Sequence, residues 1–102
     1  MSNKKVLITL SFVKKLIKQL NDPHAEDALK DSKQYCFDIP SGKQIFFRDL
    51  KLSGFAIRAT RHSLVYTVEK KMPNGVPCRV TIGDHGIYTP ETARHKATEY
   101  LL

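Results

Sequence analysis

The chain has 102 residues, enough for one small domain, and 41% of them are hydrophobic, enough for a modest core. Lysine and arginine number 17 against 10 aspartate and glutamate, which gives a formal net charge of +7 and a pI of about 9.6. A small basic domain indicates an anionic partner, most commonly nucleic acid, although some soluble proteins are basic without one.

Several classes of protein are disfavoured at the same time. No apolar run approaches the ~20 residues of a membrane span, and the N-terminal residues lack the apolar region and cleavage site of a signal peptide. The two cysteines and four histidines show no metal-ligand spacing. We therefore expect a cytoplasmic protein with reduced thiols, no metal and no cofactor.

The N-terminal part predicts one helix followed by irregular chain. Ser11 is a good N-cap, and apolar residues recur after it at helical spacing, at Val13, Leu16, Ile17 and Leu20. We predict an amphipathic helix over about 12–20, ended by Asn21-Asp22-Pro23. A second short helix over 24–29 is compatible with Asp22 as its cap and Pro23 in its first turn. A strand over 35–39 is compatible with pairing to 44–48 across a turn at 40–43.

The C-terminal part predicts three strands and a helix. The strands are expected over 55–60, 64–71 and 78–82, and Pro73-Asn74-Gly75 is a strong turn between the last two. Thr89 is the expected N-cap of the final helix, with Pro90 in its first turn and Glu91 favourable to the helix dipole. The expected fold class is α+β: a three-stranded antiparallel sheet packed against a C-terminal helix, with a short N-terminal helix and room for an extra hairpin.

Alternation divides these strands into two faces. One set is apolar and should pack on the helix residues Ala93, Ala97, Tyr100 and Leu101; it comprises Phe55, Ile57, Ala59, Leu64, Tyr66, Val68, Cys78, Val80 and Ile82. The opposite set is polar, β-branched and cationic. Such a face is either an ordinary solvated surface or one that reads bases in the major groove, as β-ribbon proteins do.

Four motifs then occur in a fixed order: Asp49-x4-Gly54-Phe55-x-Ile57-Arg58, Val65-Tyr66-x-Val68, Arg79-x-Thr81-Ile82-Gly83 and Tyr88-Thr89-Pro90-Glu91-x-Ala93-Arg94-x2-Ala97. This order resembles the arm-type DNA-binding domain at the N-terminus of phage and genomic-island integrases of the tyrosine recombinase family. The likeness covers about residues 48–101, and the Thr-Pro-Glu-x-Ala-Arg helix start is its most specific part. Glu69 departs from the pattern, because these strands often carry Arg or Lys there.

The resemblance implies that the sheet enters the major groove of double-stranded DNA at arm-type sites during site-specific DNA integration. It also implies that the catalytic Arg, His and Tyr, and the contacts with other integrase protomers, belong to domains outside this chain. We therefore expect residues 1–102 to be one non-catalytic domain of a longer integrase, with 1–44 as its N-terminal helix and irregular segment and 45–102 as its sheet and helix. Such a protein would act in a bacterial cytoplasm, on the nucleoid when it is bound to DNA.

Ten residues are the expected DNA contacts. The sheet face should carry Arg58, Thr60, Thr67, Glu69, Lys71, Arg79 and Thr81, which suit base edges. Arg61, Lys70 and Arg94 should meet phosphates.

Two other functions remain as alternatives. A double-stranded RNA-binding domain has a similar order of elements, but its last helix begins with a lysine cluster where this chain has Thr89-Pro90-Glu91. Residues 50–58 and 65–69 also resemble segments of toxin-type endoribonucleases, and His62 would then be the candidate general base. Those enzymes end in a strand, whereas a helix is predicted here.

Overall fold

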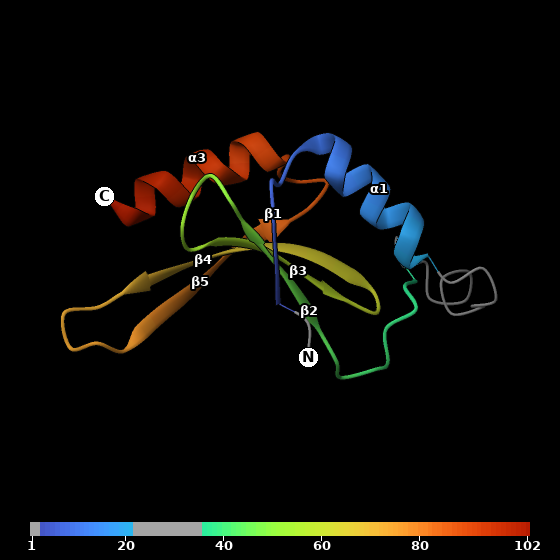
Figure 1. The fold of residues 1–102 in the computed structure, drawn as a ribbon, viewed down its shortest axis with the longest axis horizontal. Coiled ribbons are helices and arrows are strands. Elements are labelled where there is room, and N and C mark those ends of the chain that lie inside the picture. Colours follow the sequence, from blue (N-terminus) through green and yellow to red (C-terminus); the bar gives the residue numbers. More distant parts are fainter. Residues whose placement is uncertain (1–2, 22–35) are drawn as a thin grey trace.

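In the computed structural model, which describes residues 3–21 and 36–102, the chain is an α+β fold with two helices on one face of a five-stranded sheet (Figure 1). The sheet order follows the sequence: β1 (Asn3–Val6), β2 (Ile45–Asp49), β3 (Phe55–Thr60), β4 (Ser63–Lys71) and β5 (Pro77–Asp84). The helices are α1 (Leu10–Leu20) and α3 (Pro90–Leu101). β1 pairs with β2 in parallel, and every other neighbouring pair is antiparallel.

The meander predicted for the C-terminal part is confirmed by β3, β4 and β5. The tight turn between β4 and β5 is closed by a hydrogen bond of 2.8 Å from the Gly75 amide to the Met72 carbonyl. Gly75 has φ +84°, which favours glycine at this position. The β4–β5 register shifts between Tyr66 and Thr67, a bulge that increases the local twist of the sheet.

The sheet is larger than the three strands predicted. β2 pairs with β3 and β1, and not with residues 36–39, the described part of the segment predicted to pair with it. Within the described part of that segment, Phe37 forms only an isolated bridge with Asn21, so 36–39 is not a strand. The second short helix, which the sequence allows over 24–29, lies outside the residues that the structure describes.

Both helices begin with a threonine cap. α1 begins earlier than predicted, because the Thr9 side chain, rather than that of Ser11, accepts a hydrogen bond of 3.1 Å from the Phe12 amide. α3 begins where predicted. The Thr89 side chain accepts a bond from the Thr92 amide, and the Thr92 side chain accepts one from the Thr89 amide, which completes a capping box.

The core lies between the helices and the sheet, and its predicted strand residues are confirmed with one exception. Six of them are buried together with Ala93 and Ala97: Phe55, Ile57, Ala59, Leu64, Tyr66 and Val68. Val80 and Ile82 pack against them while partly buried. The exception is Cys78, which is exposed because only the last turn of α3 reaches it; the Tyr100 hydroxyl lies 3.6 Å from its sulfur.

A buried ion pair ties α3 to β2. The Arg94 guanidinium donates from Nε to Asp49 Oδ2 at 3.0 Å and from Nη2 to Asp49 Oδ1 at 3.1 Å. Burial alone would raise the pKa of Asp49, but hydrogen bonds from Arg94 and from the amides of Ile8 and Leu52 outweigh it, so the pKa is lowered. Arg94 is therefore a structural residue, and the prediction that it meets phosphates is not supported by its placement.

Candidate nucleic-acid interface

The face of the sheet opposite the helices gathers most of the predicted contact residues, and we call it the open face. Strand pairing places on it Arg58 and Thr60 of β3, three residues of β4 and two of β5. The same pairing adds residues of β1 and β2 that the prediction did not include. The open face consists of Lys5, Phe46, Arg48, Ala56, Arg58, Thr60, Ser63, Val65, Thr67, Glu69, Lys71, Pro77, Arg79, Thr81 and, beyond the bulge, Asp84.

The centre of the open face is covered by an arginine stacked on an aromatic ring. The Arg79 guanidinium lies 4.7 Å from the centroid of the Phe46 ring. Arg79 stands on β5 and Phe46 on β2, so their side chains meet across β3 and β4. Phe46 is 8% exposed and Thr67 only 2%. Thr67, predicted to contact bases, is therefore buried at the centre of the face and does not offer its side chain to a ligand there.

Arg79 is nevertheless accessible from solvent. Its Nη2 atom lies 3.2 Å from Glu69 Oε2, and its side chain is 43% exposed. An exposed pair of this kind contributes only ~0–1 kcal/mol to stability. Glu69 and Phe46 thus orient the guanidinium without binding it tightly, and it remains free to exchange them for another partner.

Arg58 holds the only buried side-chain nitrogen or oxygen without a hydrogen-bond partner among the described residues, its Nε. Arg58 stands on β3 between Phe46 and Val65 in the strand register, and the residue is half-buried. A buried donor left unpaired costs roughly 1–3 kcal/mol. An acceptor over the open face would meet the other two guanidinium nitrogens, which are not among the buried atoms, and would reach Nε only after the side chain shifts.

The other predicted contacts on this face differ in access. Lys71 and Thr81 are exposed. Thr60 is half-buried at the end of β3, where its hydroxyl contacts that of Ser63. The accessible polar groups therefore lie toward β5 and the hairpin end.

Two residues predicted to meet phosphates are placed elsewhere. Arg61 lies in the turn between β3 and β4, and its Nη1 donates to the carbonyl oxygens of Phe37 and Ile39 at 3.3 and 3.5 Å. Lys70 points to the helix side of the sheet, where its ammonium lies 5.9 Å from the Tyr100 ring centroid. Neither residue belongs to the open face.

Lys5, Phe46 and Arg48 were missed by the prediction. The signal for β2 was present in the alternation of Phe46-Phe47-Arg48-Asp49, whose second and fourth residues face the core. Extending the two-face assignment to this run would have found Phe46 and Arg48. Lys5 carried no such signal, because β1 has only four residues.

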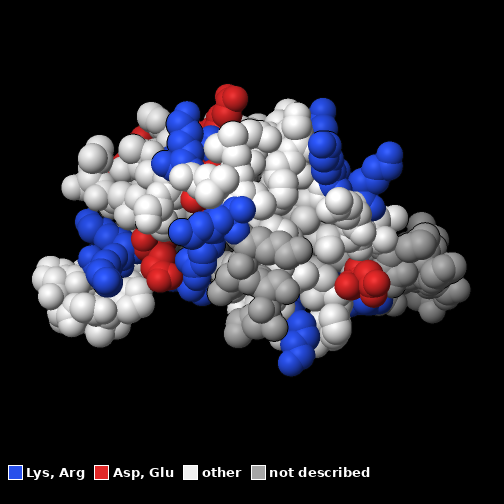
Figure 2. Space-filling model, in the orientation of Figure 1, with Lys and Arg blue, Asp and Glu red and all other residues white. Residues whose placement is uncertain are grey.

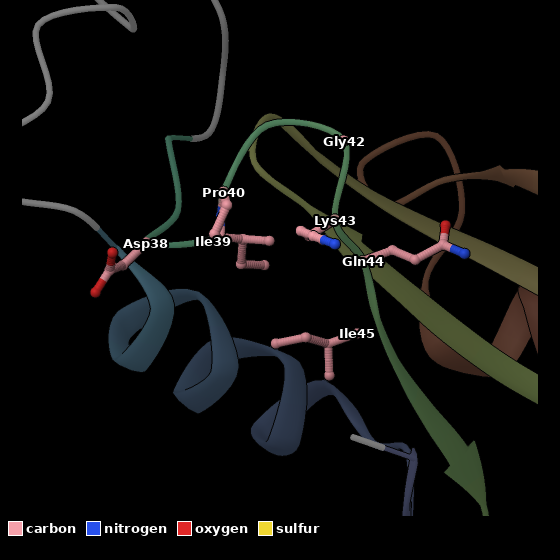
Figure 3. Close-up of a pocket in the computed structure, with 7 residues that line it drawn as sticks. All are labelled: Asp38, Ile39, Pro40, Gly42, Lys43, Gln44 and Ile45. Carbon is pink, nitrogen blue, oxygen red and sulfur yellow. The ribbon is translucent and has the colours of Figure 1, made fainter. Parts of the chain in front are cut away.

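A separate hollow of about 470 Å³ lies beside α1 and carries no evident chemistry (Figure 3). Ile39 and Ile45 lie in the space between their loop and α1, while Asp38 and Gln44 point away from it. In 3–21 and 36–102, no group of three or more His, Cys, Asp or Glu side chains could hold a metal ion. We assign no ligand to this hollow.

Comparison of the chain with models of protein families, with curated proteins and with solved structures finds no match. Neither helix in the described part of the chain is long and apolar enough to cross a membrane. What the chain does is therefore inferred from the open face and from the sequence motifs.

Proposed function

We propose that this chain binds double-stranded DNA sequence-specifically, with the open face in the major groove, as the arm-type domain of a phage-type integrase. The observation that carries the proposal is Arg58, a half-buried arginine on the open face whose buried Nε has no partner. Arginine is the side chain that most often reads guanine, through paired bonds to O6 and N7. A guanine edge would supply acceptors for this guanidinium.

The dimensions of the sheet support the same proposal. Three adjacent strands span about 10 Å, and the major groove is about 12 Å wide. β3, β4 and β5 would fill the groove with Arg58, Arg79 and Thr81 toward the bases. The helices cover the other face of the sheet and would stay outside the groove (Figure 1).

The charge of the chain supports a polyanionic partner, and the sequence motifs support a role in DNA integration. The net charge is +7, and charge of this sign speeds association with DNA. The resemblance to integrase arm-binding domains assigns DNA cleavage and joining to a separate domain. This chain would contribute binding and positioning during integration.

The test is a fluorescence anisotropy titration with a duplex selected from a randomised pool and with a scrambled duplex of the same composition. Arg58→Gln and Arg79→Gln should each lose about 1–3 kcal/mol of affinity for the selected duplex and discriminate less well. Lys14→Gln on the exposed side of α1 is the matched control, since it removes the same charge away from the sheet.

Retention of wild-type affinity and discrimination by both folded arginine variants would refute the assignment of the open face. A duplex RNA of the same sequence is included as a competitor. If it displaces the protein from DNA more effectively than unlabelled DNA does, the chain is a double-stranded RNA-binding module instead.

A further inference from the structure

Two adjoining hollows lie at one end of the open face and share Arg48, Ser53 and Gly54. One, of about 370 Å³, is completed by Glu69, Lys71 and Pro77. The other, of about 300 Å³, is completed by Lys5, Asp49 and Leu50. Figure 2 shows Lys and Arg side chains gathered near the base of the β4–β5 hairpin, with acidic side chains between them.

The charges around these hollows are not balanced. Both carboxylates in the lining already have partners, since Asp49 pairs with Arg94 and Glu69 with Arg79. The three lining cations are different: within the described residues, the side chains of Lys5, Arg48 and Lys71 have neither an ion pair nor a hydrogen bond. The two hollows therefore carry three uncompensated positive charges.

The backbone beside these cations adds hydrogen-bond donors. Gly54 has φ +96°, and a Cβ at this position would lie 2.5 Å from the Glu69 carbonyl oxygen, so only glycine allows the turn to approach β4 this closely. In the part of the chain that the structure describes, neither the Ser53 nor the Gly54 amide donates a hydrogen bond. Two amides without an acceptor and three cations without a counter-charge thus line these hollows, whose two carboxylates already have partners.

We propose that Lys5, Arg48, Ser53, Gly54 and Lys71 form a phosphate-binding site, which we call the Arg48 site, and that its ligand is a phosphodiester of the DNA backbone. This inference rests on the proposed function. If β3, β4 and β5 fill the major groove, β2 and β1 lie at its wall, where the phosphates run. Contacts of this kind fix the register of a protein on DNA without reading sequence. The site would set the position of Arg58 over its base pair.

The experiment neutralises each cation and follows binding as a function of salt. Arg48→Gln, Lys71→Gln and Lys5→Gln should weaken binding of the selected and the scrambled duplex by the same factor. Each should also make the plot of log affinity against log salt shallower by about 0.9. Lys14→Gln is the control and should leave the slope unchanged, and melting curves establish that every variant is folded.

A second measurement does not depend on any variant folding. In the wild-type protein, the amide resonances of Ser53 and Gly54 should shift when duplex DNA is added. If duplex binds and Arg58→Gln weakens it, while the three variants keep the wild-type slope and these resonances do not move, the Arg48 site is wrong and the proposed function stands. If inorganic phosphate moves these resonances and duplex does not, the assignment to the DNA backbone is wrong. If wild-type protein binds no duplex, both proposals fail.

Discussion

The Tyr66 hydroxyl lies 2.7 Å from Nδ1 of His85, which joins the middle of β4 to the loop that follows β5. Tyr66 is fully buried, and its ring also contacts the His85 ring edge-on. Burial lowers the pKa of His85 from its ordinary value of 6.5, so the folded chain favours the neutral imidazole.

This relationship predicts that the fold weakens in mild acid. The folded chain takes up a proton on His85 at a lower pH than the unfolded chain does, so protonation favours unfolding. The contribution is complete above about pH 6.5 and is lost as the pH falls toward the folded pKa. Urea unfolding of wild type and His85→Gln between pH 7.5 and 5 measures it. Parallel pH profiles for the two proteins would contradict the prediction.

Removal of the Asp49 carboxylate should destabilise the domain strongly. Asp49→Ala leaves the Arg94 guanidinium without its counter-charge, and breaking a buried pair on one side costs about 3–5 kcal/mol. Urea unfolding measures the loss, and Lys96→Ala on the exposed side of α3 should stay within roughly 0.5 kcal/mol of wild type. A change of similar size in both variants would mean that the pair contributes nothing.

Thr89→Ala should destabilise the start of α3 by ~1 kcal/mol, because it removes one half of the capping box. In a domain of this size the melting temperature should fall by roughly 4–8 °C. Thr98→Ala is the control, since its hydroxyl bonds only to the Arg94 carbonyl one turn earlier in the same helix. An unchanged thermal melt for Thr89→Ala would place the helix start elsewhere.

Glu69→Gln should tighten DNA binding. The change removes the negative charge beside Arg79 but keeps the shape of the side chain, so the guanidinium exchanges partners more easily. We expect a gain of about two- to tenfold for every duplex, or roughly 0.4–1.4 kcal/mol. Glu99→Gln on α3 makes the same change in net charge away from the open face and should have a smaller effect. A loss of affinity would instead indicate that Glu69 contacts a base directly.

The purified chain should neither cut nor join nucleic acid. The proposed function places DNA cleavage in another domain, and His62, the general-base candidate of the ribonuclease alternative, lies in the turn between β3 and β4. Supercoiled plasmid and a structured RNA are each incubated with the protein and run on gels. Nicking, a covalent tyrosine adduct or RNA cleavage by clean protein would contradict the prediction.

Elements set by local chemistry could be read from the sequence. The cap at Thr89 and the alternation of 55–60 depend on residues within a few positions, and the structure has both. The start of α1 depends on more. Thr9 and Ser11 are both good caps, and in the structure Thr9 caps the helix. The neighbouring Ile8 amide donates to Asp49, 41 residues away, so the chain before the helix is held by a contact distant in sequence.

The candidate site was less predictable, because alternation gives the face of a side chain and not its partner. Arg94 was predicted to meet phosphates because its actual partner, the Asp49 carboxylate, lies 45 residues earlier in the chain. Nothing close to Arg94 in the sequence indicated that pair. Arg79 was placed on the correct face, but nothing near it in sequence indicated that it would lie on Phe46. Lys70 and Lys71 are adjacent in a strand, so only one of them can belong to the open face.

The parallel pairing of β1 with β2 has a kinetic consequence. β3, β4 and β5 are joined by short turns, so they can pair early in folding. β1 can pair with β2 only after a long loop that contains all of α1 has closed. We expect β1 to join last during folding and its amides to exchange with solvent sooner than those of β3 and β4. Each time β1 separates from β2, Lys5 moves away from Arg48. The time that this four-residue strand stays paired therefore sets how long the two cations lie side by side.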